Sequence, residues 1–160
     1  MRRITPCLWF NNQAVEAVDF YLGIFKDSKK GDTTYYGKSS AAVSGQPEGK
    51  VLTVGFELNG ADYLALNGGP EFKFTQAISM MVWCETQEEI DYYWEKLQAD
   101  GGKPSQCGWL EDKFGLSWQV VPTYIEEAMK DPAKHERMMA ALVQMTKLDL
   151  AALKTAAENN

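Results

Sequence analysis

The sequence has few of the residues from which metal and redox sites are usually built. Its 160 residues contain a single histidine, His135, and three cysteines, Cys7, Cys84 and Cys107, which are widely spaced and form no CxxC pair. An odd number of separated cysteines does not indicate a disulfide framework. We therefore expect reduced thiols, as in a cytoplasmic protein, and a solvated His135.

Positive charge and long apolar runs are also scarce. The 16 Lys and Arg residues are outnumbered by 22 Asp and Glu residues, which gives a formal net charge of -6. Nucleic-acid binding needs a clustered positive surface that contacts phosphates. A membrane-spanning helix needs about 20 consecutive apolar residues, and the N-terminal MRRITPCLWF is too short in its apolar part for a signal peptide. The composition therefore favours a cytoplasmic protein without a nucleic-acid or membrane partner.

The clearest positive signal is a β-hairpin. Residues 51–58 and 61–67 are strand-like runs joined by Asn59 and Gly60, the pair preferred in a two-residue type I′ turn. A loop of this length also fixes the register of the two strands. The predicted opposed pairs are Leu58 and Ala61, Phe56 and Tyr63, and Val54 and Ala65.

An internal repeat is the second positive signal. Apolar residues recur at helical spacing in two segments, at Val18, Tyr21, Leu22 and Phe25 and, 72 residues later, at Ile90, Tyr93, Trp94 and Leu97. Each predicted helix follows a strand-like run and precedes further strands. Asn11 and Asn12 supply turn and N-cap chemistry for the first helix, and Thr86 with Glu89 forms a capping box for the second. The sequence therefore predicts a βαβββ unit that occurs twice.

These elements predict one α+β domain over residues 1–160. It consists of a first βαβββ module over 1–75, a second over 76–122 and a helical extension over 123–160. Asp131 is a suitable N-cap in the extension, with Pro132 at the first helical position. The extension carries a methionine-rich apolar surface, which packs against the chain's own sheet in the interpretation we favour, or against a dimer partner in the alternative.

Five segments carry a resemblance to a known family. In order they are ITPCLWF, VDFYLGIF, GFELNGADYLALNGGPEF, CETQEEIDYYWEKL and CGWLEDKFGLSWQVVP. From about residue 4 to residue 157, the chain resembles the PhnB-like, 3-demethylubiquinone-9 3-methyltransferase-like branch of the vicinal oxygen chelate superfamily of glyoxalases and bleomycin-resistance proteins. The resemblance implies paired βαβββ modules that form a half-open curved sheet around a cavity, with helices outside, and a homodimer.

The resemblance also bears on metal binding. Metal-dependent members of the superfamily carry one ligand on each of four strands, and the equivalent positions here are Pro6, Ala65, Ser79 and Gln119. A divalent ion needs three or four imidazole, carboxylate or thiolate donors, so we expect no catalytic metal. We expect no other cofactor, because no GxGxxG or similar glycine-rich loop between a strand and a helix supports the S-adenosylmethionine binding that the family label suggests.

Strand alternation then selects a candidate ligand-binding set. If Ala65, Ser79 and Gln119 face the cavity, its wall carries Leu8, Phe10, Phe56, Tyr63, Asn67, Ser79, Met81, Trp83 and Gln119. The other face of the hairpin, with Thr53, Gly55, Leu64 and Leu66, then packs beneath a helix. Such a wall suits an apolar or aromatic small molecule held by one or two hydrogen bonds, although ordinary core packing would use the same residue types.

Two classes of function remain at this point. The first is a small-molecule-binding protein without a catalytic metal, and the second is a metal-independent enzyme that uses Tyr63, Ser79, Gln119 or Cys107 on a small organic substrate. We favour binding, because no nucleophile and base can be paired from the sequence and no catalytic residue is identified. Packing is the preferred role for Cys107, and solvated surface charge is preferred for Glu57, Asp62, Glu111 and Asp112.

Overall fold

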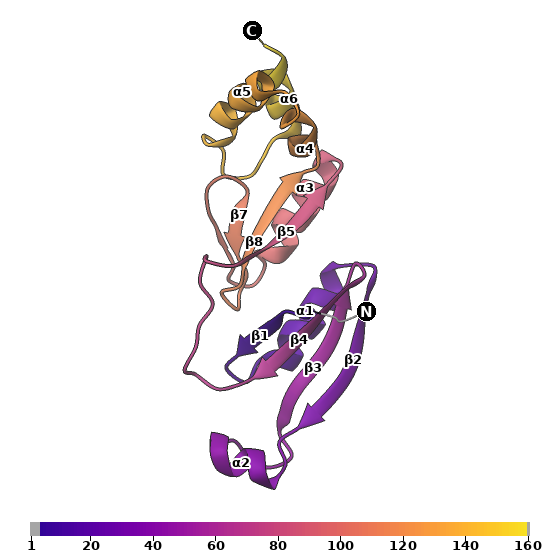
Figure 1. The fold of residues 1–160 in the computed structure, drawn as a ribbon, viewed down its shortest axis with the longest axis vertical. Helices are drawn as coiled ribbons and strands as arrows, with labels where there is room; N and C mark the ends of the chain where they lie inside the picture. The colour runs from indigo at the N-terminus through magenta and orange to yellow at the C-terminus, as the bar shows by residue number, and fades with distance from the viewer. Residues whose placement is uncertain (1–3, 160) are drawn as a thin grey trace. The chain divides into compact units, whose positions relative to one another are not determined.

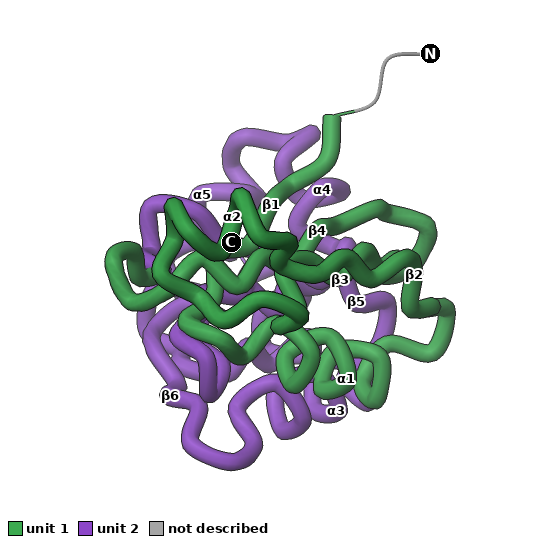
Figure 2. The backbone as a smooth tube through the Cα atoms, turned by 90° about the horizontal axis from the view of Figure 1, so that it is seen from below, with its two compact units in different colours: residues 1–73 green, residues 74–160 purple. Residues whose placement is uncertain are grey.

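The repeated sequence pattern folds into two four-stranded sheets, one in each of two units of the chain (Figure 1). The computed structural model describes residues 4–159 and divides between Lys73 and Phe74, as the two colours of Figure 2 indicate. Both sheets are mixed and open, and helices follow the second one. The predicted α+β class with repeated βαβββ modules is confirmed. No helix within residues 4–159 has the length and apolarity needed to cross a bilayer.

The first unit contains four strands and two helices. They are β1 (Cys7–Phe10), α1 (Ala14–Ile24), β2 (Ser28–Tyr35), α2 (Lys38–Ser44), β3 (Val51–Leu58) and β4 (Ala61–Asn67). The strand order is β1-β4-β3-β2, with β1 parallel to β4. Asn59 and Gly60 have φ angles of 47° and 81°, and Phe56 lies opposite Tyr63, so the type I′ hairpin and its register are confirmed.

Helix α1 covers the sheet face that carries Phe56. The fully buried Tyr21 of α1 stacks on Phe56 with ring centroids 6.2 Å apart. Val54, Ala65 and Leu8 are buried on the same face. The expectation that Thr53, Gly55, Leu64 and Leu66 pack beneath the helix was therefore wrong: alternation separates the two faces of a strand but does not say which one a helix covers.

The start of α1 is held by a distant side chain. Asn67, at the end of β4, accepts a hydrogen bond from the Ala14 backbone N–H through Oδ1 at 2.9 Å. The Asn67 Nδ2 donates to the Val51 carbonyl at 3.1 Å. The Tyr36 hydroxyl donates to the backbone carbonyl of Asn67 at 2.6 Å. The predicted cap by Asn11 and Asn12 was wrong, because no side chain of the preceding turn caps this helix. Asn67 has a structural role beneath α1.

The second unit repeats this order of elements. It contains β5 (Ser79–Cys84), α3 (Gln87–Leu97), β6 (Lys103–Pro104), β7 (Trp109–Glu111) and β8 (Ser117–Pro122), in the strand order β5-β8-β7-β6. The Thr86 hydroxyl accepts a hydrogen bond from the Glu89 N–H at 3.2 Å, which confirms the predicted N-cap. Helices α1 and α3 begin 73 residues apart, at Ala14 and Gln87, so the structural repeat is one residue longer than the sequence spacing indicated.

Three further helices complete the second unit at one end of its sheet (Figure 1). They are α4 (Tyr124–Ala128), α5 (Pro132–Leu142) and α6 (Leu150–Glu158). Asp131 accepts a hydrogen bond from the Ala133 N–H at 2.9 Å, as the sequence predicted. The helices form an apolar cluster that includes β8, and its buried residues are Val121, Ala128, Met138, Leu142, Leu148, Leu153 and Ala157. This part of the methionine-rich surface therefore packs on its own chain.

Candidate functional site

The face of the second sheet that lies opposite α3 carries large exposed apolar side chains. Val82 and Cys84 of β5 are buried, while Met81 and Trp83, which alternate with them along the strand, are 46% and 43% exposed. Cross-strand register places Met81, Gln119 and Trp109 in one row across β5, β8 and β7. Directly opposed residues share a face and contact one another, so this row is one continuous surface. We call this side of the second sheet the open face.

A hydrogen-bonded pair lies within the open face. The Gln119 Nε2 donates to the Ser79 Oγ at 2.8 Å. The Gln119 carbonyl oxygen remains as an acceptor, and the Ser79 hydroxyl can still donate. The structure thus brings together four of the predicted site residues, Ser79, Met81, Trp83 and Gln119, as apolar surface beside a polar pair.

The next row along the open face is polar. Ser79, Ser117, Glu111 and Lys103 follow one another across β5, β8, β7 and β6. The Gln76 side chain, from the segment before β5, donates a hydrogen bond to Glu111 Oε1. A cavity of about 540 Å³ is lined by Gln76, Lys103, Glu111 and Ser117 and extends to Ser105, Gln106, Cys107 and Trp109.

Ser117 has an unusual environment in this cavity. The residue is 1% exposed, and its Oγ has no hydrogen-bond partner within residues 4–159. Buried hydroxyl groups are almost always hydrogen-bonded, because burial without a partner costs about 1–3 kcal/mol. Ser117 therefore brings a buried hydroxyl without a partner to the border of this cavity.

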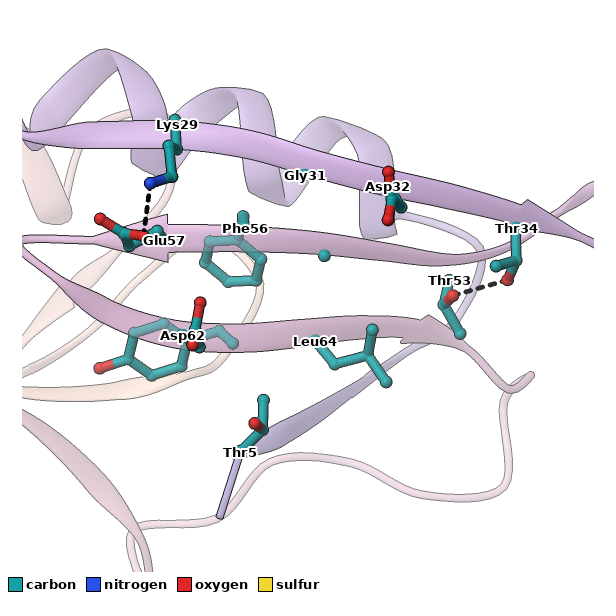
Figure 3. A pocket seen from close by; sticks show the side chains of 12 residues that line it. Thr5, Lys29, Gly31, Asp32, Thr34, Thr53, Phe56, Glu57, Asp62 and Leu64 are labelled. Atoms are coloured by element: carbon teal, nitrogen blue, oxygen red, sulfur yellow. Dashed lines mark hydrogen bonds and ion pairs between the residues drawn. The ribbon is translucent and has the colours of Figure 1, made fainter. Parts of the chain in front are cut away.

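The sheet of the first unit has a hollow on the face away from α1 (Figure 3). It has a volume of about 410 Å³, and Gly31 and Gly55 meet there without side chains. A Cβ atom on Gly31 would lie 3.1 Å from the Gly55 carbonyl oxygen, a tight contact, so this approach of the two strands favours glycine. An ion pair of 2.8 Å between Lys29 and Glu57 stands beside it.

The first-unit candidates are divided between this hollow and the core. Leu8, Phe10 and Asn67 are buried beneath α1 and line neither cavity. Phe56 and Tyr63 border the hollow, but their rings, which stack at 5.3 Å, belong to the face that α1 covers. Burial raises the pKa of the Tyr63 hydroxyl. The sequence had grouped all of these residues with Ser79 and Gln119 on one cavity wall.

The strand registers also change the positions that correspond to superfamily metal ligands. Each parallel pair ends in register, Phe10 with Asn67 and Cys84 with Pro122. Gln119 precedes Pro122 by the same number of residues as Leu64 precedes Asn67, so Gln119 corresponds to Leu64 and not to Ala65. By the same count from Cys84 and Phe10, Ser79 corresponds to Thr5 and not to Pro6. Thr5 and Leu64 line the hollow of the first unit.

The resulting donor set does not fit a catalytic divalent ion. Threonine, leucine, serine and glutamine offer no imidazole, carboxylate or thiolate at these positions. Within residues 4–159, no three His, Cys, Asp or Glu side chains gather into a possible metal site.

The acidic turn before β8 is built differently from the prediction. Asp112 is 3% exposed, and its Oδ1 accepts hydrogen bonds from the Phe114 and Leu116 N–H groups at 2.9 and 3.0 Å. Its Oδ2 accepts from Trp118 Nε1 at 2.8 Å. The prediction that Asp112 is a solvated surface charge was wrong, because a carboxylate with three donors around it is stable when buried.

The polar row was not predicted from the sequence. Glu111 was expected in a solvated turn, and no role was expected for Lys103, Gln76 or Ser117. The available signal was the register of the closing hairpin: once Trp109 is paired with Gln119, alternation places Glu111 and Ser117 opposite each other on the same face.

Neither Cys84 nor Cys107 has the surroundings of an activated nucleophile. Burial raises the pKa of Cys84 to about 12, with the Glu89 charge as a smaller cause. Cys107 is half-buried, packs against the apolar cluster of the C-terminal helices and donates its backbone N–H to the Met145 carbonyl at 2.7 Å. A reactive cysteine is typically an accessible thiolate with a cationic neighbour. These contacts favour a packing role for both residues.

The two turns that join β1 to α1 and β5 to α3 contain no glycine-rich nucleotide-binding loop. Residues 11–13 connect β1 to α1, and residues 85 and 86 connect β5 to α3, and neither connection contains glycine. A glycine-rich turn is what lets a backbone approach a bound cofactor at a helix N-terminus.

Comparisons with known proteins agree with this architecture. Residues 2–121 match the family model described as 3-demethylubiquinone-9 3-methyltransferase. A solved structure of a "putative 3-demethylubiquinone-9 3-methyltransferase, PhnB protein" from Bacillus cereus is 34% identical, with a TM-score of 0.66, and the match covers 76% of this chain and all of that one. Protein PA1353 from Pseudomonas aeruginosa is 19% identical with a TM-score of 0.60, over 76% of this chain and 98% of its own. None of the curated proteins matches this chain.

Proposed function

This chain belongs to the 3-demethylubiquinone-9 3-methyltransferase family, the PhnB-like branch of the glyoxalase and bleomycin-resistance superfamily, and from that premise we propose that it binds a small aromatic or apolar molecule on the open face of its second sheet, without a catalytic metal. The methyltransferase name describes the family and the Bacillus cereus protein. The glycine-free turns before α1 and α3 and the donor set on the strands favour binding over group transfer.

One observation carries the proposal. Two large apolar side chains, Met81 and Trp83, are nearly half exposed beside the hydrogen-bonded pair of Gln119 and Ser79. Leaving such side chains in water forgoes about 1.5–3 kcal/mol for each one that could be fully buried. An aromatic ligand that covers them recovers part of this energy, while the amide and hydroxyl orient it.

The proposal extends to the assembly state. We propose a homodimer, which is common among related proteins, and a location in the cytoplasm. Size-exclusion chromatography with light scattering measures the mass directly. A mass that stays at the 18.0 kDa of one chain across micromolar concentrations would contradict the dimer and leave the ligand proposal standing.

The ligand proposal can be tested with the purified protein. Native mass spectrometry detects any co-purified molecule, and a fragment screen by saturation-transfer NMR identifies aromatic binders. Gln119→Ala is expected to weaken a bound aromatic fragment about 5-fold, because one net hydrogen bond contributes about 1 kcal/mol. Trp83→Ala is expected to weaken it further through the loss of apolar contact.

A matched control separates the site from general effects. Trp9 of the first unit is a tryptophan outside the second sheet, so Trp9→Ala should leave fragment binding unchanged if the variant remains folded. The proposal fails if no aromatic fragment binds, or if Gln119→Ala and Trp83→Ala bind every fragment as the wild type does. Stoichiometric zinc, nickel or iron in elemental analysis would contradict the metal-free site.

A further inference from the structure

The unpartnered Ser117 hydroxyl lies within a balanced set of charges. Lys103 and Glu111 are directly opposed on β6 and β7, and Glu111 is directly opposed to Ser117 on β8. Lys103 forms no ion pair within the described part of the chain. Glu111 uses Oε1 to accept from Gln76, which leaves Oε2 as a second acceptor. One cation, one carboxylate and one hydroxyl therefore border the same cavity.

The charge balance selects among possible ligand groups. A carboxylate would gain from Lys103 but would be repelled by Glu111, and an ammonium group would meet the reverse situation. A neutral group with an acceptor beside a donor can satisfy both residues. It can also bond Ser117, whose hydroxyl donates and accepts.

We propose that the cavity beside Ser117 binds an uncharged amide-type group, whose carbonyl accepts from Lys103 or Ser117 and whose N–H donates to Glu111. This inference rests on the proposed function, because it adds the polar end of the ligand whose apolar body lies on the open face. Trp109 belongs to both parts: it lines the cavity and is directly opposed to Gln119. The preferred ligand is therefore an aromatic amide.

Three probes of similar size test the preference. Benzamide, benzoate and benzylamine share the aromatic ring and differ in the polar group, and their dissociation constants are measured by saturation-transfer NMR or calorimetry at pH 7. We expect benzamide to bind at least about 5-fold more tightly than either charged probe, since one net hydrogen bond corresponds to about that factor. Equal affinities, or tighter binding of an ion, overturn the proposal.

Ser117→Ala distinguishes a ligand-binding hydroxyl from a structural one. A structural hydroxyl would stabilise the free protein, so its removal would lower the melting temperature. The Ser117 Oγ has no partner within the described residues, so we expect the free variant to be as stable as the wild type or more so, with benzamide affinity about 5-fold lower. Ser39→Ala, the same change at an exposed position in α2, is the control and should alter neither quantity.

Glu111→Gln tests the charge balance independently. The variant keeps an oxygen that can accept from Gln76 but removes the negative charge opposite Lys103. The ratio of benzoate to benzamide affinity is expected to rise several-fold, and an unchanged ratio overturns the role of Glu111. If none of the three probes binds, the proposed function itself fails; if all bind without preference and Ser117→Ala has no effect, only the amide inference fails.

Discussion

Asp112 organises the turn between β7 and β8 through a single buried carboxylate. Its two oxygens accept from the indole of Trp118 and from two backbone N–H groups. The same turn positions Glu111 opposite Ser117, so the geometry of the polar row depends on it.

We expect Asp112→Ala to destabilise the protein by about 2–4 kcal/mol, because three donors, two of them buried, lose their acceptor. The free energy of unfolding from urea denaturation measures the effect. Glu95→Ala, on the exposed surface of α3, is the matched control and should change stability by less than about 0.5 kcal/mol. A loss of similar size in both variants would contradict the role assigned to Asp112.

Asp91 of α3 supplies a pH-dependent contact with the C-terminal segment. Hydrogen bonds from Lys147, and secondarily from Gln87, hold the pKa of the Asp91 carboxyl below its ordinary value of 3.8. Because the folded pKa is the lower one, this stabilisation is present above pH 3.8 and is lost as the pH falls through the folded value. We expect Lys147→Ala to raise the Asp91 pKa toward its ordinary value in a carboxyl NMR titration. Lys130→Ala should leave the titration unchanged.

At the scale of elements, the sequence predicted the turns and helix caps that depend on neighbouring residues. The Asn59–Gly60 hairpin, the Thr86 cap and the Asp131 cap each depend on residues a few positions apart, and all three are confirmed. The cap of α1 comes from Asn67, 53 residues away from Ala14. No local pattern contains that contact, so only the folded sheet could show it. Helix α2 was not predicted from the sequence. Its seven residues bury none of their side chains, so no apolar face marks the segment as a helix.

Replacing either of two glycines by alanine should change the stability of the protein, in opposite directions for the two positions. Gly60 has a φ angle of 81° in the hairpin turn, where an L-residue is strained, so Gly60→Ala should destabilise by about 1 kcal/mol or more. Gly23 lies in α1, and a Cβ atom there would meet no atom within 4 Å. Gly23→Ala should therefore stabilise by about 0.5–1 kcal/mol. Melting temperatures that shift in the same direction for both variants would contradict the backbone roles assigned to these glycines.

At the scale of the whole molecule, the chain is divided at the connection between β4 and β5. Residues 68–78 contain no helix or strand, and most of them, including Lys73, are exposed. Proteases require an accessible segment that can adopt an extended conformation. We expect the first internal tryptic cleavage after Lys73, with mass spectrometry showing one product that ends there and one that begins at Phe74. Lys73→Gln should remove this cleavage, whereas early cleavage after Lys130 or Lys147 would contradict the prediction.

The sheet faces on which the candidate residues lie were predictable in one unit and not in the other. In the second unit, Ser79, Met81, Trp83 and Gln119 lie on the open face as alternation from Gln119 predicted. In the first unit, alternation was counted from Ala65 instead of Leu64. Since strand faces alternate with a period of two, this shift by one residue exchanged the open face for the helix-covered face.

The separation of the two sheet faces also has a consequence for how such a protein changes over time. Along β5, neighbouring residues serve different purposes, because Val82 and Cys84 are buried while Met81 and Trp83 face outward. On β8, every residue except Gln119 is buried. Mutations at outward positions such as Met81 or Gln119 leave the core intact. Natural variation can therefore alter this outward surface one residue at a time while the fold is inherited unchanged, and a laboratory library confined to these positions would retain a high proportion of folded members.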